Sequence, residues 1–119
     1  MAVTIYHNPR CSKSRATLEL ITDSGVSHNI VLYRDDAPDG PTIKDLAEKL
    51  GVSVAAIMRQ GDSEFKEASD LPDLSDDSAS ADWVAQHPNV LQRPIVVKDE
   101  TGEAVIGRPP ENVLKLLSG

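Results

Sequence analysis

The chain contains very little cysteine and very few aromatic residues. Its 119 residues include one cysteine, one tryptophan, one phenylalanine and two tyrosines. A single cysteine cannot form an internal disulfide, which fits a reducing compartment, so we expect a cytoplasmic protein. One cysteine with three scattered histidines also offers no zinc-ligand spacing, and we expect no metal site.

Long apolar runs and a net positive charge are absent as well. A membrane-spanning helix needs about 18 or more consecutive apolar residues, and the sequence has no such run, so no membrane partner is expected. The formal charge of −7 argues against nucleic-acid binding, which needs a basic surface. The length predicts one domain, residues 1–119, and we expect a monomer.

The only cysteine lies in a locally basic segment. Cys11 follows the β-rich run 3–6 and is flanked by Arg10, Lys13 and Arg15, with no acidic residue in the first 18 positions. A helix N-terminus and nearby cations can lower a cysteine pKa from about 8.5 to about 3.5–7.5. A small buried core cysteine is the alternative interpretation. The cationic flanks favour a reactive thiol.

The two ends of the chain predict a mixed α/β sheet. Residues 3–6 and 29–33 are expected to be strands joined by a helix that ends at Gly25. The second strand has the nearly continuous apolar character of a buried parallel strand. Residues 95–98 and 103–106 flank a turn and predict an antiparallel hairpin. A last helix should follow Pro109, with four residues facing inward: Val113, Leu114, Leu116 and Leu117.

The middle of the chain, residues 42–87, is expected to be a helical insertion. Thr42 and Asp45 resemble a capping box for a helix that ends at Gly51, and Ser53 can cap a short helix after it. A group of aspartates has no calcium-loop spacing and is expected to form a solvated face: Asp70, Asp73, Asp76, Asp77 and Asp82. The order βαβ, helices, ββα predicts an α/β, thioredoxin-like fold with a mixed four-stranded sheet.

Six short segments carry a resemblance to a known family. In chain order they are Ile5-Tyr6-His7-Asn8-Pro9, Ser14-Arg15, Ile57-Met58-Arg59, Gln86-His87-Pro88, Arg93-Pro94-Ile95-Val96-Val97 and Gly107-Arg108-Pro109. The chain resembles the glutaredoxin-dependent arsenate reductase family, whose members have a thioredoxin-type fold. Arg10 is a departure, since some members carry a small residue there.

The resemblance implies a nucleophile and an oxyanion site. Cys11 is then the nucleophile, Arg59, Arg93 and Arg108 hold the arsenate, and Pro94 is a cis-proline that faces the cysteine. Guanidinium groups suit this task, because they bind tetrahedral oxyanions through paired, charge-assisted hydrogen bonds. Each arginine alone would be read as a solvated surface charge, but the three motif positions together with the thiol favour the site.

Two further residues near the thiol leave alternatives open. Ser14 stands where related oxidoreductases carry a resolving cysteine, and its hydroxyl either donates to the Cys11 sulfur or belongs only to the first turn of the helix. His7 either helps to depress the Cys11 pKa as an imidazolium or merely forms a hydrogen bond within the loop. His28 and His87 are expected to be structural.

The implied reaction is reduction of arsenate to arsenite. Cys11 thiolate attacks arsenic(V), glutathione reduces the adduct as a co-substrate, and glutaredoxin clears the mixed disulfide. The expected partners are therefore arsenate or a similar oxyanion, glutathione and glutaredoxin, with no bound cofactor. The lack of a second cysteine agrees, because the electrons must come from an external thiol.

Two other functions remain open on the same fold. One is a glutathione-linked thiol transferase acting on protein mixed disulfides, which nothing in the sequence excludes. The other is a non-enzymatic redox or transcription regulator. Regulators of this fold use a Cys-X-X-Cys switch, whereas the pattern here is Cys11-Ser12-Lys13-Ser14.

Overall fold

A computed structural model describes residues 1–118, so the last residue of the predicted domain, Gly119, lies outside it. The chain forms two compact units. One consists of Met1–Asp36 together with the chain from Arg93, and the other is Ala37–Gln92. The helical segment is thus wider than the predicted 42–87, and a single domain stays a prediction. None of the helices in residues 1–118 has the length and apolar character needed to cross a membrane.

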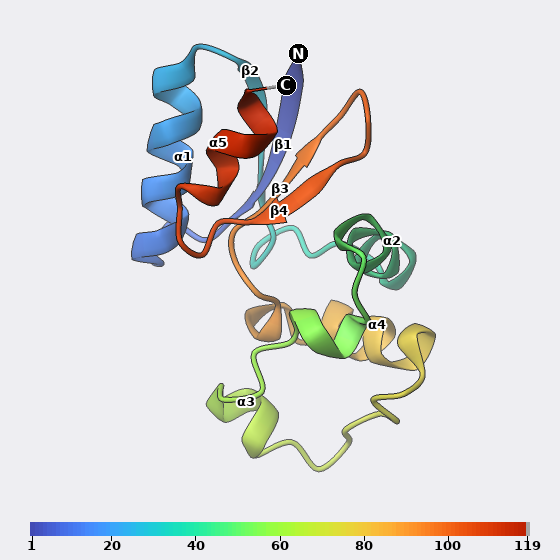
Figure 1. Ribbon diagram of the computed structural model, residues 1–119. Helices are drawn as coiled ribbons and strands as arrows, with labels where there is room; N and C mark the ends of the chain where they lie inside the picture. Colours follow the sequence, from blue (N-terminus) through green and yellow to red (C-terminus); the bar gives the residue numbers. More distant parts are fainter. Residues whose placement is uncertain (119) are drawn as a thin grey trace. The chain divides into compact units, whose positions relative to one another are not determined.

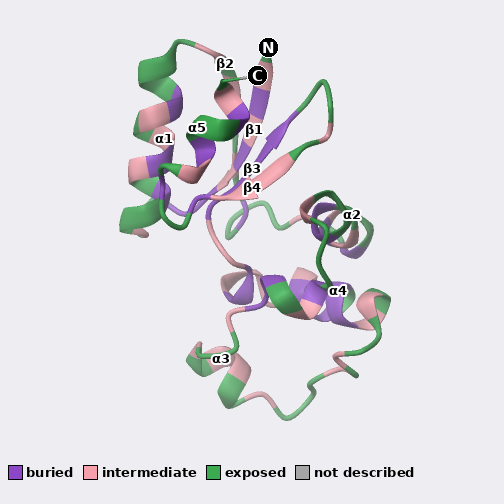
Figure 2. Ribbon diagram, in the orientation of Figure 1, coloured by how far each residue is buried: buried purple, intermediate pink, exposed green. Residues whose placement is uncertain are grey.

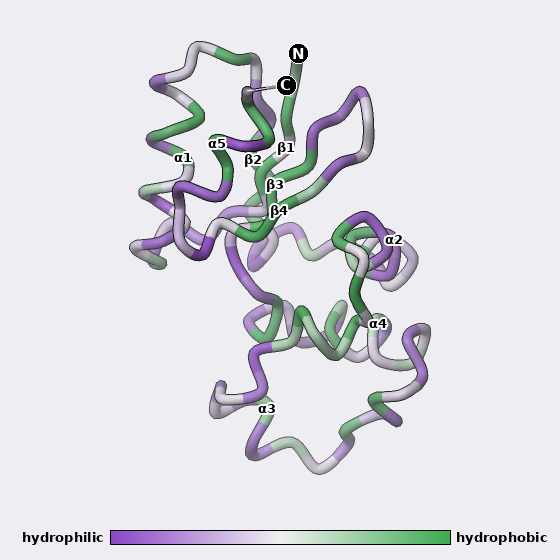
Figure 3. Tube along the Cα trace, in the orientation of Figure 1, coloured by the Kyte–Doolittle hydropathy of each residue, from purple (hydrophilic) through white to green (hydrophobic). Residues whose placement is uncertain are grey.

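The first unit contains the predicted thioredoxin-like sheet. Its strands are β1 (Ala2–His7), β2 (Ser27–Leu32), β3 (Ile95–Lys98) and β4 (Ala104–Ile106), and its helices are α1 (Ser12–Ser24) and α5 (Asn112–Leu117). The strand order is β2-β1-β3-β4, with β1 parallel to β2 and antiparallel to β3 (Figure 1). β3 and β4 form the predicted hairpin, whose tip is hydrophilic (Figure 3).

The core of this unit lies on the sheet face that α1 and α5 cover. Alternation along β1 buries every second side chain, and six buried residues from both helices and two strands pack together: Val3, Ile5, Ile21, Val96, Val113 and Leu116. Figure 2 shows this buried layer between helices and sheet. Burying one such aliphatic side chain contributes about 1.5–3 kcal/mol. This layer supports the end of β1, where the Cys11 loop begins.

Two expectations about burial are wrong in this unit. β2 is not a buried strand, because it lies at the sheet edge with one neighbour, and Ile30 and Leu32 are 46% and 40% exposed. Leu114 does not face inward either. It is 46% exposed, because α5 turns only Val113 and Leu116 fully into the core and Leu117 lies half-buried.

The second unit is helical. It contains α2 (Gly40–Leu50), a 3-10 helix η1 (Val54–Ile57), α3 (Ser63–Lys66), α4 (Asp77–Gln86) and a 3-10 helix η2 (Pro88–Val90). α2 and α4 pack against each other and against η1, and their buried side chains form a core: Ile43, Leu46, Ala47, Val54, Ile57, Ala81 and Val84.

The caps of the second unit differ in part from expectation. Asp39, not Thr42, caps α2: its carboxylate accepts a hydrogen bond from the Thr42 N–H at 2.9 Å, and the helix begins earlier with Pro41 in its first turn. Ser53 caps η1 as predicted, accepting from the Ala56 N–H at 3.3 Å.

The aspartates of residues 70–82 are not simply a solvated face. Asp76 caps α4, accepting from the Ala79 N–H at 3.1 Å, and Asp77 accepts from the Val54 N–H at 3.2 Å. Asp70 accepts from the Trp83 indole N–H at 3.1 Å. These carboxylates accept hydrogen bonds from N–H donors both near and far in the sequence, which is a structural role that a count of charges could not distinguish from solvation.

Candidate functional site

The loop between β1 and α1 is built by its own hydrogen bonds. Asn8 is buried, with 3% of its surface exposed, and its N–H donates to the Ser14 hydroxyl oxygen at 3.0 Å. Its side-chain and backbone oxygens accept from the N–H groups of Arg10 and Cys11, both at 3.0 Å. This asparagine, which the sequence analysis did not single out, therefore shapes the turn that presents the thiol.

Cys11 is the N-cap residue of α1, with the extended backbone that an N-cap requires, and its side chain is half-buried. Partial burial raises the pKa of Cys11, but the N–H groups of Ser14 and Lys13, the Arg108 charge and hydrogen bonding from Arg93 together lower it below its ordinary value. The Cys11 side chain makes no cap hydrogen bond to the first turn of α1, but the N–H groups of Ser14 and Lys13 lie near enough to the sulfur to lower its pKa. The predicted activation of the thiol thus has a physical basis.

Two of the three predicted arginines lie at the thiol. Arg108 donates from Nη2 to the Cys11 sulfur at 3.5 Å, and its Nε–H donates to the Arg93 carbonyl oxygen at 2.8 Å. The Arg93 side chain also stabilises the Cys11 thiolate. Residues far apart in the sequence therefore place a thiol and two guanidinium groups together.

The segment that carries Arg108 is held from both sides. The Gly107 N–H donates to the Pro94 carbonyl oxygen at 2.9 Å, and the Asn112 amide donates to the carbonyl oxygens of Arg108 and Ile106 at 3.1 and 3.2 Å. The Arg93–Pro94 peptide bond is cis, as the resemblance implies for Pro94, and the Arg108–Pro109 bond is cis as well. The two site arginines are therefore anchored to one another through the backbone.

His7 and Ser14 form a buried pair behind the loop. His7 Nδ1 and the Ser14 oxygen are 2.6 Å apart, and both residues are buried. Burial and the neighbouring Arg15 charge lower the pKa of His7, which favours the neutral ring and the loop-bonding alternative over the imidazolium. The Ser14 hydroxyl binds His7 and Asn8, whereas its backbone N–H is the group that acts on the sulfur.

Arg59 belongs to the second unit. Its N–H donates to the Val90 carbonyl oxygen at 2.6 Å, and its guanidinium lies 3.8 Å from the Asp62 carboxylate. Met58 and Leu91 pair beside it in a short antiparallel bridge. Its participation in the Cys11 site stays a prediction.

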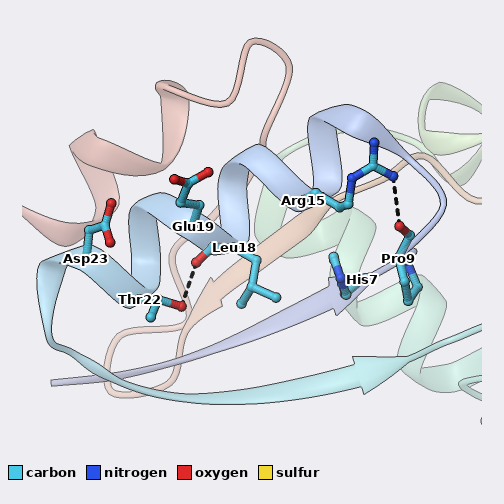
Figure 4. A pocket seen from close by; sticks show the side chains of 7 residues that line it. All are labelled: His7, Pro9, Arg15, Leu18, Glu19, Thr22 and Asp23. Carbon is cyan, nitrogen blue, oxygen red and sulfur yellow. Dashed lines mark hydrogen bonds between the residues drawn. The ribbon is translucent and has the colours of Figure 1, made fainter.

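A groove of about 460 Å³ runs along α1 next to the loop (Figure 4). Its lining includes His7, Leu18, Glu19 and Asp23, and Arg15 closes one end by donating from Nη1 to the Pro9 carbonyl oxygen at 2.9 Å. Cys11 does not line it. The groove is therefore a neighbour of the thiol site and not a part of it.

The site carries a nucleophile and cations but no set of metal ligands. No group of three or more His, Cys, Asp or Glu side chains among residues 1–118 is arranged to hold a metal ion. A stabilised thiolate beside two guanidinium groups can bind a small oxyanion and attack it. The geometry therefore suits nucleophilic chemistry on an anionic substrate.

Comparisons with known proteins agree with this chemistry. Residues 6–116 match the profile of the ArsC family. The chain is 44% identical to an arsenate reductase of Neisseria meningitidis serogroup A, over 97% of each chain, and 44% identical to the uncharacterized protein YfgD of Escherichia coli K12, over 97% and 96%. A solved structure of an arsenate reductase from Vibrio cholerae superposes with a TM-score of 0.85 at 41% identity, covering 97% of both chains. The chain belongs to the ArsC family.

Proposed function

We propose that the protein reduces arsenate to arsenite, with Cys11 as the nucleophile. The observation that carries the proposal is the 3.5 Å contact from Arg108 Nη2 to the Cys11 sulfur, together with a thiol pKa below its ordinary value. Membership of the ArsC family and the names of its relatives support arsenate as the oxyanion.

In the first step the oxyanion binds and the thiolate attacks. Arg93 and Arg108, with Arg59 as the third arginine by resemblance, hold the arsenate oxygens and offset their charge. The sulfur of Cys11 forms a bond to arsenic(V), one arsenic–oxygen bond breaks, and that oxygen leaves as water after taking up protons from the bound acid or from solvent. Arsenic stays in the +5 state in this adduct.

In the second step an external thiol supplies the electrons. Glutathione thiolate attacks the Cys11 sulfur, a sulfur–sulfur bond forms, and the electron pair of the sulfur–arsenic bond passes to arsenic, which leaves as arsenite. Glutaredoxin thiolate then attacks the glutathione sulfur of the mixed disulfide and releases Cys11 as thiolate. The chain has no second cysteine that could resolve the intermediate internally, which is why the proposal includes both thiols. Glutathione keeps thiols reduced in the cytosol, and the proposed reaction needs a reduced thiol donor. We therefore propose a cytoplasmic location.

The test is arsenate-dependent NADPH oxidation in the presence of glutathione, glutaredoxin and glutathione reductase. The wild-type protein should support turnover and Cys11→Ser should not, because an alcohol neither attacks as readily nor forms a mixed disulfide. Turnover of a glutathionylated protein without any turnover of arsenate would instead establish the thiol transferase. Absence of both activities would leave a non-enzymatic regulator.

A further inference from the structure

Tyr33 has a buried hydroxyl group without a hydrogen-bond partner. The residue directly follows β2 in the first unit, and its side chain is fully buried at 0% exposure. Within residues 1–118, no donor or acceptor makes a hydrogen bond of acceptable geometry to its oxygen. A buried hydroxyl left in this state costs about 1–3 kcal/mol, and buried tyrosines normally have a partner. The missing partner needs an explanation.

The groups around this hydroxyl are those of the candidate site. Burial raises the pKa of Tyr33, and this effect exceeds the opposing effects of the Arg93 charge and of the polar groups of Asn8 and Arg93; the charge of Cys11 raises the pKa further. Asn8 and Arg93 are thus close enough to act on the phenol without bonding it well. At neutral pH the phenol keeps its proton, so the O–H group remains a donor.

The Tyr33 hydroxyl can donate a hydrogen bond, but the neighbouring residues provide no acceptor that it bonds. Arg93 carries only donors, and the side-chain oxygen of Asn8 accepts from the Arg10 N–H at 3.0 Å but makes no hydrogen bond with the Tyr33 hydroxyl. An oxyanion beside Cys11 would bring several acceptor oxygens to a place lined by guanidinium N–H groups. The same anion would satisfy the Tyr33 hydroxyl.

We propose that the Tyr33 hydroxyl donates a hydrogen bond to the oxyanion bound at Cys11, as a further substrate-contacting residue of this site. The proposal rests on the proposed function and deepens it. It assigns to the site a neutral donor that complements the cationic donors, and it gives a role to a hydroxyl at a position where phenylalanine would bury the same ring.

The test is Tyr33→Phe, with Tyr6→Phe as the matched control, since these are the only two tyrosines of the chain. The affinity of arsenate, sulfate and phosphate is measured from the protection that each gives to Cys11 against alkylation. Tyr33→Phe should bind arsenate about tenfold or more weakly, the loss expected for a hydrogen bond to a charged group. Tyr6→Phe should bind as the wild type does.

Thermal stability separates this role from a structural one. A buried hydroxyl without a partner does not stabilise the fold and carries a desolvation cost, so Tyr33→Phe should melt at the wild-type temperature or above it. A melting temperature lower by about 4 °C or more would show that the hydroxyl holds the fold together, and the assignment would be wrong.

A spectroscopic titration gives a second readout. In the Tyr6→Phe variant the only phenolate absorbance comes from Tyr33, and bound sulfate should shift its ionisation to higher pH, because a nearby anion disfavours the phenolate. Protection of wild type and Tyr33→Phe to the same degree, with no sulfate shift, would overturn the Tyr33 assignment alone. If the wild type binds none of the three anions, the proposed function fails and this inference fails with it.

Discussion

Arg108 and Cys11 are 97 positions apart in the sequence, and Arg108 donates from Nη2 to the cysteine sulfur at 3.5 Å. Its Nε–H is bound to the Arg93 carbonyl oxygen, so the orientation of the guanidinium is set by the neighbouring site arginine. A charge held in this way stabilises the thiolate and is ready to bind a substrate oxygen. The contact links the activation of the nucleophile to the recognition of the anion.

The first prediction concerns the ionisation of Cys11. Because the pKa of Cys11 in the folded protein is below the reference value of 9.0, the rate of alkylation by iodoacetamide should rise with pH with a midpoint below that value. For an acid with a lowered folded pKa, the associated stability is present above the unfolded pKa and is lost as pH falls through the folded pKa. A midpoint at or above the reference value would contradict the activation of the thiol.

The second prediction concerns Arg108. Arg108→Ala should raise the Cys11 pKa and weaken arsenate binding or turnover by about 1.5–3 kcal/mol, since a charged hydrogen-bonding partner is lost. Arg108→Lys should recover only part of this, because an ammonium lacks the planar fork that spans two oxygens. Lys115→Ala removes an exposed cation of the same unit and serves as the control. Equal effects of both alanine variants would indicate a general charge effect.

The third prediction concerns Arg59, which the family resemblance alone assigns to the site. Its ion pair with Asp62 is 3.8 Å long and partly exposed, so its loss should change stability by only about 0–1 kcal/mol. Arg59→Ala should nevertheless weaken arsenate binding by about 1.5–3 kcal/mol. Lys66→Ala in the same unit is the control, and binding is measured as protection of Cys11 from alkylation. An Arg59→Ala variant with wild-type affinity would remove this residue from the site.

The sheet could be predicted because each strand has a local signal. The β-rich run 3–6, the apolar run near 30 and the hairpin turn at 99–102 give the strands and their directions. The edge position of β2 could not be predicted, since the sequence of a strand does not state how many neighbours pair with it. The prediction that Leu114 faces inward was wrong for a similar reason. Helix periodicity allows both Val113 and Leu114 to face the core, and the packing of α5 buries only Val113 of the two.

The site could be predicted only in part. Cys11, Arg93 and Arg108 stand in recognisable motifs, whereas Tyr33 appears as the end of an apolar strand and Asn8 as an ordinary turn residue. The role of Ser14 depends on the direction of its hydroxyl, which the sequence does not contain. The cap of α2 was predicted at Thr42 and not at Asp39, because Thr42 and Asp45 also fit a capping pattern.

The fourth prediction concerns His7 and acid stability. Its folded pKa is below the reference value of 6.5, so its contribution to stability is fully present above that value and is lost as pH falls through the folded pKa. His7→Asn keeps a polar group close to the position of Nδ1 but cannot take up the proton. Denaturant unfolding should therefore show a smaller loss of stability in His7→Asn than in wild type as pH falls below 6.5. A profile identical to that of the wild type for His7→Asn would contradict the neutral buried ring.

The last prediction concerns Gly107, which lies between β4 and Arg108. A Cβ atom at Gly107 would meet the Thr17 side chain and come within 2.7 Å of Pro94 Cγ, and neither neighbour is the end of a flexible side chain. Gly107→Ala should therefore destabilise the protein by about 1–3 kcal/mol and displace the adjacent Arg108 from the sulfur, which raises the Cys11 pKa. Gly61→Ala is the matched control, since nothing lies within 4 Å of its added Cβ. Denaturant unfolding and the pH dependence of alkylation measure the two effects on the same samples. The prediction is that the close approach of Gly107 to α1 and Pro94 positions Arg108. The loss of stability and the rise of the Cys11 pKa should then occur together in Gly107→Ala. A destabilised variant with an unchanged Cys11 pKa would show that Arg108 is positioned by other contacts.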